Sequence, residues 1–274
     1  VFGVAAACAL LFVRTTAPPA PPGVLTVSFL DVGQGDATLI QHPDGSAVLF
    51  DGGPPEGRVA RLLRGAGVRR LSAVVMTHAS RDHQGGVAEV IERYPVDLLV
   101  DGGDGTLDRD FRATVEAARG RGIRRVEAVA PMTLRAGGLD IRILAPQARP
   151  PGSPPEDPNA RAVVAIVSAG GFELLLSADA ESPSLAPLTL PDVDAMKVPH
   201  HGSSDPGLGE LLDRLRPEVA AIEVGSDNTY GHPAPSTLSA LHDAGVATFR
   251  TDENGTVTLT VKDGRMSVQP ERGG

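Results

Sequence analysis

The chain has 274 residues, of which 41% are hydrophobic and 22% are charged, and its formal net charge at pH 7 is -9. This length and apolar content suit one large domain or two small ones and exclude a chain that is disordered throughout. The negative charge excludes a protein that coats nucleic acid through basic side chains, although a metal-dependent site for a phosphodiester stays compatible with it. The single cysteine, Cys8, lies in an N-terminal apolar stretch, so residues 24–274 contain neither a disulfide nor a cysteine zinc site.

The N-terminal stretch is apolar from Val1 to Val13 and ends at Arg14. It is shorter than the roughly 20 residues that span a bilayer, and it lacks the basic region of a signal peptide. We therefore expect residues 1–14 to be the end of a transmembrane helix. The proline-rich sequence TTAPPAPPG at 15–23 predicts an extended linker, and residues 24–274 are expected to form the folded domain.

Three strand-like runs open this domain at 24–31, 36–41 and 46–53, and the turn-rich sequences VGQG and HPDG separate them. This pattern predicts a β meander, and a helix is predicted to follow at 56–67. Beyond it, short apolar runs alternate with helical patterns, at 71–76, 86–94, 96–100, 109–122 and 124–129. Such alternation is typical of α/β layering.

A second β-rich stretch follows, with a strand at 139–146 and a hairpin around Gly170–Gly171. The alternation of strands and helices then returns, at 194–199, 206–215, 218–225 and 235–245. The last two runs, 247–252 and 255–261, are predicted to pair as a hairpin. Two β-rich stretches that are each followed by helices predict an α/β protein in which two sheets pack face to face with helices outside, a four-layered αββα sandwich.

Residues with metal-binding chemistry gather in the sequence THASRDHQGG at 77–86, directly after an uncharged strand. His78, Asp82 and His83 are spaced so that a loop leaving the strand can turn two imidazoles and a carboxylate toward one point, an arrangement that suits a divalent cation. Gly85 and Gly86 then allow a sharp turn into the next helix. A lone loop histidine more often forms only local hydrogen bonds, but three clustered ligand residues favour a metal site.

Other apolar runs also end in polar residues, namely Asp31, Asp36, Asp51, Asp179, His200, His201 and His232. Each of them alone is more often a capping or turn residue. Together with the loop at 77–86, they would supply a one- or two-metal hydrolytic site. The two remaining histidines, His42 and His242, are expected to be ordinary surface residues.

These motifs resemble the metallo-β-lactamase superfamily, whose signature is HxHxDH followed by Gly-Gly. More narrowly, they resemble the C-terminal hydrolase-like domain of the ComEC family, the DNA-uptake channel proteins of bacterial competence. The matching motifs cover about residues 24–265 and read FLDVGQGDATLI, LFDGG, THASRDHQGG, LLSAD, KVPHHGS, YGHPAP and RTDENG. The resemblance implies the four-layered αββα fold of the superfamily and a hydrolase that degrades the non-transforming DNA strand.

The resemblance also implies where the domain works and with what. A multi-pass channel domain would precede it in the membrane, and the hydrolase domain would lie on the extracytoplasmic side of the cell membrane. Its partners would be DNA, single-stranded or duplex, the channel domain and other competence proteins.

Carried over by motif, the resemblance implies six metal ligands, namely His78, Asp82, His83, Asp179, His201 and His232. The implied catalytic residues are Asp82, His200, His201 and His232, with either His201 or its neighbour His200 as a ligand or a stabiliser of the transition state. Asp31, Asp36 and Asp51 would lie behind the ligands or at the rim. The cofactor would be Mn²⁺ or Zn²⁺, and the carboxylates favour Mn²⁺.

Two positions depart from the family pattern. Ser80 stands where the superfamily has histidine and ComEC proteins often have aspartate, so Ser80→Asp is expected to raise metal occupancy and Ser80→Ala to change little. Ala162 stands where relatives often carry serine, which removes a possible hydrogen bond near the site. Two alternatives to a nuclease stay open, namely a hydrolase of a small ester, thioester or lactam, and a catalytically weak domain that guides DNA.

Overall fold

The structure is a computed structural model that describes residues 22–102, 108–150 and 156–273. The expected end of a transmembrane helix at 1–14 and residues 15–21 of the expected linker lie outside these ranges. In the part of the chain that the structure describes, every helix is too short or too polar to cross a membrane.

Eight strands form the first sheet within the described residues: β1 (Leu25–Phe29), β2 (Thr38–Gln41), β3 (Ala47–Phe50), β4 (Ala73–Met76), β5 (Leu98–Asp101), β6 (Arg124–Glu127), β14 (Val257–Lys262) and β15 (Arg265–Pro270). Their order across the sheet is β15-β14-β1-β2-β3-β4-β5-β6. β1, β2 and β3 pair antiparallel, which confirms the predicted meander, and β3 to β6 run parallel.

Seven strands of the same described ranges form the second sheet: β7 (Met132–Ala136), β8 (Leu139–Ala145), β9 (Val164–Ala169), β10 (Phe172–Leu176), β11 (Ala195–Lys197), β12 (Val219–Ile222) and β13 (Ala247–Arg250). Their order is β13-β12-β11-β10-β9-β8-β7. β9 and β10 form the predicted hairpin around Gly170–Gly171, and β10 to β13 run parallel.

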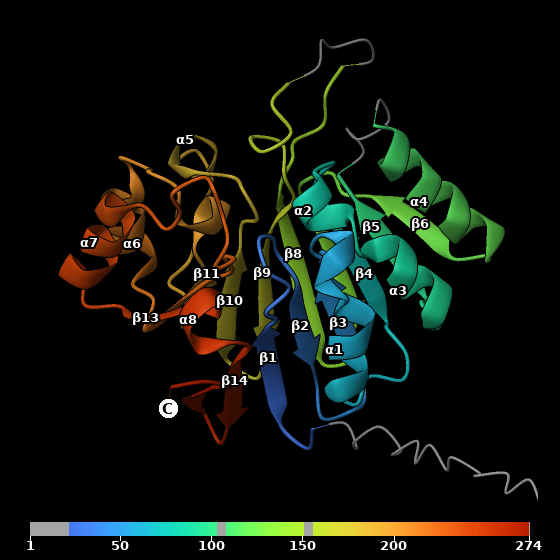
Figure 1. Cartoon of the computed structure of the whole chain (residues 1–274), viewed down its shortest axis with the longest axis horizontal. Coiled ribbons are helices and arrows are strands. Elements are labelled where there is room, and N and C mark those ends of the chain that lie inside the picture. The colour runs from blue at the N-terminus through green and yellow to red at the C-terminus, as the bar shows by residue number, and fades with distance from the viewer. Residues whose placement is uncertain (1–21, 103–107, 151–155, 274) are drawn as a thin grey trace, which may run out of the picture.

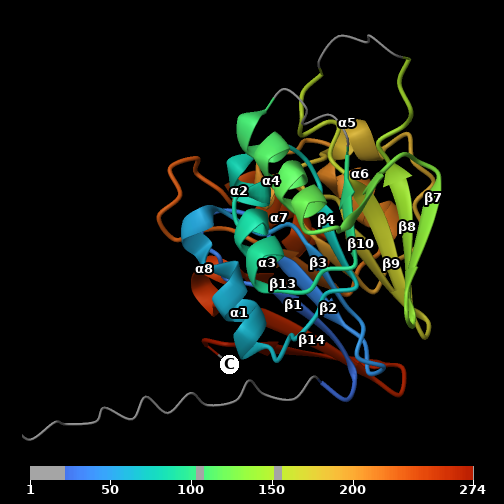
Figure 2. The same cartoon turned by 90° about the vertical axis from the view of Figure 1, so that its right-hand side faces the viewer.

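Helices cover the outer faces of the two sheets (Figures 1 and 2). Within the described ranges, the α-helices are α1 (Val59–Gly65), α2 (Arg81–Gln84), α3 (Val87–Arg93), α4 (Arg109–Gly120), α5 (Ser182–Leu185), α6 (Leu208–Leu215), α7 (Pro235–Asp243) and α8 (Thr251–Asn254), and the 3-10 turns are η1 (Pro55–Gly57) and η3 (Pro199–Gly202). α3 and α4 lie beside the first sheet and α6 and α7 beside the second, which gives the layers seen in Figure 1. The prediction of a four-layered αββα sandwich is confirmed.

Alternation along the buried strands explains the layering, because successive side chains of a strand point to opposite faces. In β3, Val48 and Phe50 pack in the core between the two sheets, while Ala47 and Leu49 pack in the core under the helices of the first sheet. Strands buried on both faces read as continuous apolar runs, as the sequence does here.

Three separate apolar cores lie between the four layers. The middle core joins the two sheets. The second lies between the first sheet and its helices and includes Leu63 of α1 and Phe111 of α4. The third lies between the second sheet and its helices and includes Leu211 of α6 and Leu241 of α7. Each amphipathic helix thus buries its apolar face on one sheet.

The predicted C-terminal hairpin is wrong. β13 pairs with β12 in the second sheet, whereas β14 pairs with β1 and β15 in the first sheet, and α8 carries the chain between them. Val257 and Leu259 of β14 are buried in the core between the sheets. Burial of these side chains favours pairing of β14 with β1 in the first sheet over pairing with β13. β7 and β15 were not predicted.

Candidate metal centre

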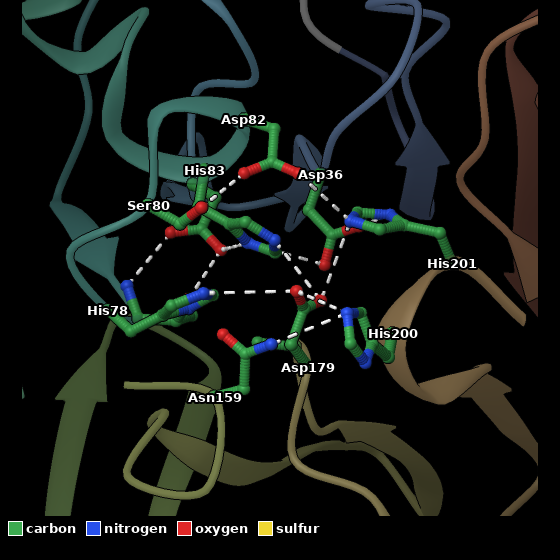
Figure 3. Close-up of polar contacts among 12 residues, drawn as sticks. Asp36, His78, Ser80, Asp82, His83, Asn159, Asp179, His200 and His201 are labelled. Atoms are coloured by element: carbon green, nitrogen blue, oxygen red, sulfur yellow. Dashed lines mark hydrogen bonds and ion pairs between the residues drawn. The ribbon is translucent and has the colours of Figure 1, made fainter. Parts of the chain in front are cut away.

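Loops that leave the strands at one edge of the sandwich carry the polar residues of the candidate site. Asp36 lies between β1 and β2, and Asp51 follows β3. His78 and His83 follow β4. Asp179 follows β10, and a histidine pair lies in η3, directly after β11. Carboxyl ends of parallel strands share an edge, so segments far apart in the sequence meet there. Figure 3 shows the side chains of Asp36, Asp179 and the histidines of these loops pointing toward one another.

Hydrogen bonds on the Nδ1 side orient the two central histidines. His83 Nδ1 lies 2.8 Å from Asp51 Oδ2, and His201 Nδ1 donates to the backbone carbonyl of Glu223 across 2.8 Å. With the Nδ1 proton engaged, each ring presents an unprotonated Nε2 when it is neutral. Such a partner behind a histidine is typical of metal sites, where it fixes both tautomer and ring orientation.

Asp179 lies where the Nε2 atoms converge. Its Oδ1 is 3.1 Å from His83 Nε2 and 3.6 Å from His201 Nε2. Its Oδ2 is 3.8 Å from His78 Nε2 and 3.7 Å from His200 Nε2. One carboxylate therefore faces the Nε2 atoms of four imidazoles, an arrangement in which carboxylate and imidazoles could bind the same cation.

The buried polar atoms of this cluster fit a divalent cation. Five of them have no hydrogen-bond partner among the described residues: Asp36 Oδ1, His78 Nε2, His83 Nε2, Asp179 Oδ1 and His201 Nε2. Buried polar groups are rarely left unpaired, because each costs about 1–3 kcal/mol. Four of the same residues, Asp36, His83, Asp179 and His201, each offer one ligand atom within 4.8 Å of the others. Imidazole and carboxylate donors in this combination suit Zn²⁺ or Mn²⁺.

Asp36 lies behind two histidines of the cluster. Its carboxylate lies on the Nδ1 side of the histidines, with Oδ1 3.1 Å from His201 Nδ1 and Oδ2 3.6 Å from His83 Nδ1. Lys197 Nζ is 2.6 Å from Asp36 Oδ2 and donates to the carbonyl of Ala178 across 2.7 Å. Asp36 thus supports the histidines from behind and is itself neutralised by a buried lysine.

Two buried charged residues beside the cluster were not predicted. They are Lys197, which is fully buried, and Glu223, whose carboxylate accepts hydrogen bonds from Ala37 N and Thr38 Oγ1. Burial raises the pKa of Glu223 to about 8, and the nearby Asp36 adds to the effect. The sequence did contain a signal, because both charged residues lie inside the apolar runs 194–199 and 218–225, which should be buried.

Left-handed backbone conformations place several of these residues. Among the described residues, seven non-glycine residues have positive φ, and four of them border the cluster: Asp51 (φ 58°), Ala178 (φ 48°), His200 (φ 47°) and His201 (φ 52°). Non-glycine residues adopt this region at an energetic cost, and such strain concentrates at functional sites. The consecutive left-handed pair in η3 brings both histidines to Asp179.

Two glycines allow the loops to approach each other. A Cβ atom on Gly35 (φ +140°) would lie 2.1 Å from the carbonyl oxygen of Asp82, next to the hydrogen bond from Asp36 N to that oxygen. A Cβ atom on Gly86 would lie 2.2 Å from the carbonyl oxygen of Gly52. The glycines of the DVGQGD and HQGG motifs are therefore explained by backbone contact.

Two histidines of the cluster have pKa values that are shifted in opposite directions. Burial lowers the pKa of His201, but the carboxylates of Asp179 and Asp36 raise it more strongly, to about 10. Burial and the charge on His83 lower the pKa of His78 to about 3. Without a cation, His201 therefore carries a proton at neutral pH and His78 does not.

Cation binding is expected to release protons at pH 7 and to tighten as the pH rises toward 10, because a ligand must lose its proton first. In the metal-free chain, the raised pKa of His201 means that protonated His201 stabilises the folded state. Its contribution to stability is fully present below pH 6.5 and is lost as the pH rises through about 10. Calorimetric titration with Mn²⁺ or Zn²⁺ in two buffers of different ionisation enthalpy measures the release. Heats that are independent of the buffer would contradict this expectation.

Ser80 has a role that its sequence position did not reveal. Its hydroxyl donates a hydrogen bond to Asp82 Oδ1, and the other oxygen of Asp82, Oδ2, lies 3.3 Å from His201 Nε2 (Figure 3). The backbone carbonyl of Ser80 accepts from His83 N at 3.1 Å and from Gln84 N at 2.8 Å, at the start of α2. Ser80 therefore orients Asp82, and the expectation that Ser80→Ala changes little is revised.

Ser80→Ala is expected to weaken divalent cation binding by roughly tenfold or more, since partners that orient ligands are worth about 10–100-fold in affinity. Ser80→Asp sets a second carboxylate beside Asp82, so it should destabilise the metal-free chain and bind the cation more tightly. Calorimetry and thermal unfolding with and without Mn²⁺ measure both effects. The exposed serine of β15 supplies a control, Ser267→Ala, and equal affinities in the control and Ser80→Ala would refute the orienting role.

The structure places the remaining predicted residues around the cluster. His232 lies one ring further out, with its ring centroid 5.7 Å from that of His200, and burial and the neighbouring His200 lower its pKa. This position does not favour His232 as a direct ligand. Asp31 pairs with Arg272 at 2.8 Å and does not enter the cluster. Ala162 is fully buried in the core under the helices of the second sheet.

The two remaining histidines, which were expected at the surface, differ in exposure. His242 is exposed on α7, whereas His42 is partly buried and lies 3.0 Å from Asp44.

The chain belongs to the metallo-β-lactamase superfamily, whose sequence profile matches residues 30–224. The solved structure of Tm1679, titled a metal-dependent hydrolase of the β-lactamase superfamily, superimposes with a TM-score of 0.59 at 13% identity and covers 87% of this chain and 100% of that one. At this identity the likeness shows the fold alone. The chain is therefore a domain of this superfamily, with a group of histidine and aspartate side chains that could hold a metal ion.

Its relatives are ComEC-family competence proteins, as the resemblance implied. ComE operon protein 3 of Bacillus subtilis (strain 168) is 28% identical over 269 residues, which cover 89% of this chain and 34% of that protein. Competence protein ComA of Neisseria gonorrhoeae is 27% identical over 266 residues, which cover 94% of this chain and 35% of that protein. The chain spans about a third of the length of these relatives.

Proposed function

We propose that the chain is a phosphodiesterase that hydrolyses DNA with the help of a divalent cation. The observation that supports this most directly is the convergence of three buried imidazole nitrogens, the Nε2 atoms of His78, His83 and His201, on the carboxylate of Asp179. Next to them lie Asp82 and His200, which are only partly buried. A buried ligand set with one accessible side is the arrangement that lets a substrate reach a bound ion.

We assign the ligands to His78, Asp82, His83, Asp179 and His201, with Mn²⁺ or Zn²⁺ as the ion. Once bound, the ion would supply Lewis-acid activation of water and neutralisation of phosphate charge. The chain holds its ligands in place through Asp51 behind His83, the carbonyl of Glu223 behind His201, and Ser80 beside Asp82. These contacts fix the ligands before the ion or the substrate arrives.

His200 is the proposed general acid–base residue: its Nε2 would take a proton from the attacking water and return it to the leaving oxygen. Its Nδ1 lies 3.0 Å from Glu181 Oε1, and its Nε2 lies 3.3 Å from Asn159 Nδ2 and 3.7 Å from Asp179 Oδ2. With Glu181 holding the Nδ1 proton, Nε2 is the atom that takes up or gives a proton on the side of the cluster. General acids of this kind contribute about 10²–10⁴-fold to a rate.

We extend the proposal to the full-length protein. The chain corresponds to about a third of the length of its relatives. In this proposal the domain degrades the non-transforming strand during DNA uptake and works with other competence proteins. In the same proposal a membrane channel domain belongs to the full-length protein, and the hydrolase domain lies on the extracytoplasmic side of the membrane. The support for this context is the similarity to competence proteins.

Incubation of the chain with several substrates and metals tests the proposal. The substrates are single- and double-stranded oligonucleotides, bis(p-nitrophenyl) phosphate, nitrocefin and a thioester, each with Mn²⁺, with Zn²⁺ and with a chelator. We expect cleavage of DNA and of the phosphodiester, stimulation by metal, and loss of both activities with the chelator.

Each alternative function predicts a different result in this panel. Cleavage of nitrocefin or the thioester with no phosphodiester cleavage would identify a hydrolase of small substrates. Binding of DNA with no cleavage under any metal would identify a DNA-guiding domain. Either result would refute the proposed phosphodiesterase.

A further inference from the structure

An exposed aromatic ring lies close to the candidate metal centre. Among residues 22–102, 108–150 and 156–273, Tyr230 is the one large apolar side chain that is exposed, with 69% of its surface accessible. The chain has two tyrosines and no tryptophan, so exposed aromatic surface is scarce. A single exposed apolar residue is not evidence of a site by itself. Its position relative to other rings provides the argument.

Three rings form a row from solvent to the cluster. Tyr230 stacks on His232 with a centroid distance of 5.9 Å and an interplanar angle of 15°. The His232 ring lies 5.7 Å from that of His200, whose Nε2 is 3.7 Å from Asp179 Oδ2. Tyr230 is the outer end of this row and is largely exposed. It therefore offers aromatic surface that is separated from His200 by the ring of His232.

The loop that carries Tyr230 is braced by its own hydrogen bonds. Asn228 Nδ2 donates to the carbonyls of Gly225 at 2.8 Å and His232 at 2.9 Å, and its Oδ1 accepts from His232 N at 3.1 Å. Gly225 N donates to Gln34 Oε1 at 3.1 Å, which ties the loop to the DVGQGD motif. The ring is therefore presented by a held loop, and less conformational entropy is lost when a ligand stacks on it.

We infer that Tyr230 is a stacking platform for an unpaired base of the DNA, adjacent to the phosphate that a cation at the candidate metal centre would bind. This inference rests on the proposed phosphodiesterase function and narrows its substrate to single-stranded DNA. Bases stack on aromatic side chains whatever their identity, whereas in a duplex both faces of a base are covered by its neighbours. Stacking also suits a chain with a net charge of -9, because it supplies affinity that does not depend on neutralising phosphates.

The test measures binding of a fluorescent, phosphorothioate-linked single strand, which resists cleavage, to the chain in the presence of Mn²⁺. Tyr230→Ala should weaken binding by roughly 5- to 100-fold, because stacking of one base on an aromatic side chain is of that size. Tyr230→Phe keeps the ring and should bind within about threefold of the parent, since a phenyl ring also stacks. Thr229→Ala alters the exposed neighbour in the same loop and controls for disturbance of the loop; it should bind like the parent.

A strand with abasic positions separates stacking from every other contact. Without bases, the parent and Tyr230→Ala should bind equally, and the loss seen with the normal strand should disappear. A 2-aminopurine base in the strand should be quenched by the parent and by Tyr230→Phe, and less by Tyr230→Ala. Equal weakening on normal and abasic strands, or no weakening on either, would overturn the inference.

The two proposals can fail independently. Cleavage of DNA with no dependence of binding on Tyr230 would overturn the stacking platform and keep the phosphodiesterase. Base-dependent binding through Tyr230 with no cleavage under any metal would keep the platform and remove the phosphodiesterase. Tighter binding of duplex than of single strand would overturn the assignment of single-stranded DNA as the substrate.

Discussion

Asp179→Asn is expected to abolish metal-dependent hydrolysis and to lower the affinity for Mn²⁺ or Zn²⁺ by more than about a hundredfold. Residues that merely orient a ligand are worth about 10–100-fold, and Asp179 is the carboxylate on which the ligands converge. Its oxygens lie 3.1 Å from His83 Nε2 and 3.6 Å from His201 Nε2. The amide keeps the shape of the side chain but removes the charge that attracts both the imidazolium groups and the cation.

The measurement is metal content after gel filtration, a calorimetric titration, and phosphodiester cleavage. Asp213→Asn, an exposed acid on α6, is the matched control and should behave like the parent. Circular dichroism establishes that the variant is folded. Full metal content together with normal cleavage in folded Asp179→Asn would rule out the candidate centre as the site of hydrolysis.

Lys197→Met is expected to lower the free energy of unfolding of the metal-free chain by about 3–5 kcal/mol, the usual cost of removing one partner from a buried ion pair. Lys197 Nζ is 2.6 Å from Asp36 Oδ2 and 3.7 Å from Asp179 Oδ1. Burial lowers the pKa of Lys197, but Asp36, Asp179 and Glu223 together raise it above its usual value, so the side chain is charged. Methionine fills a similar volume but removes the positive charge that lies closest to the carboxylate of Asp36.

Urea unfolding at pH 7 with and without Mn²⁺ measures this effect. A cation bound to the folded state should restore part of the lost stability, because it stabilises the folded state by mass action and supplies positive charge. Lys262→Met changes an exposed lysine of β14 and should alter stability by less than about 0.5 kcal/mol. Unchanged stability of Lys197→Met would show that the buried lysine does not balance the acids of the centre.

The sequence alone determined the layers of the fold and the loop at 77–86. Apolar runs of strand length alternating with helical patterns are local signals, and they predicted the αββα sandwich that the structure has. His78, Asp82 and His83 are close in sequence, so a single loop after β4 had to bring them close in space. For these residues, proximity in the chain was enough.

Only the tertiary structure decided which strand pairs with which at the C-terminus. β14 follows β13 after a short helix, and sequence neighbours usually pair. Its two core residues, Val257 and Leu259, instead close the first sheet against β1. Burial between the sheets is a non-local gain that no local pattern reports.

The tertiary structure also decided what each acid and base around the centre does. Asp36, Lys197 and Glu223 come from three different loops or strands; Asp36 alone was more typical of a turn residue, and no local pattern singled out Lys197 or Glu223. Ser80 read as a poor metal ligand, yet its hydroxyl orients Asp82. The physical reason is that the role of a buried polar group is set by the partners that replace its water, and those partners are contributed by distant segments of the chain.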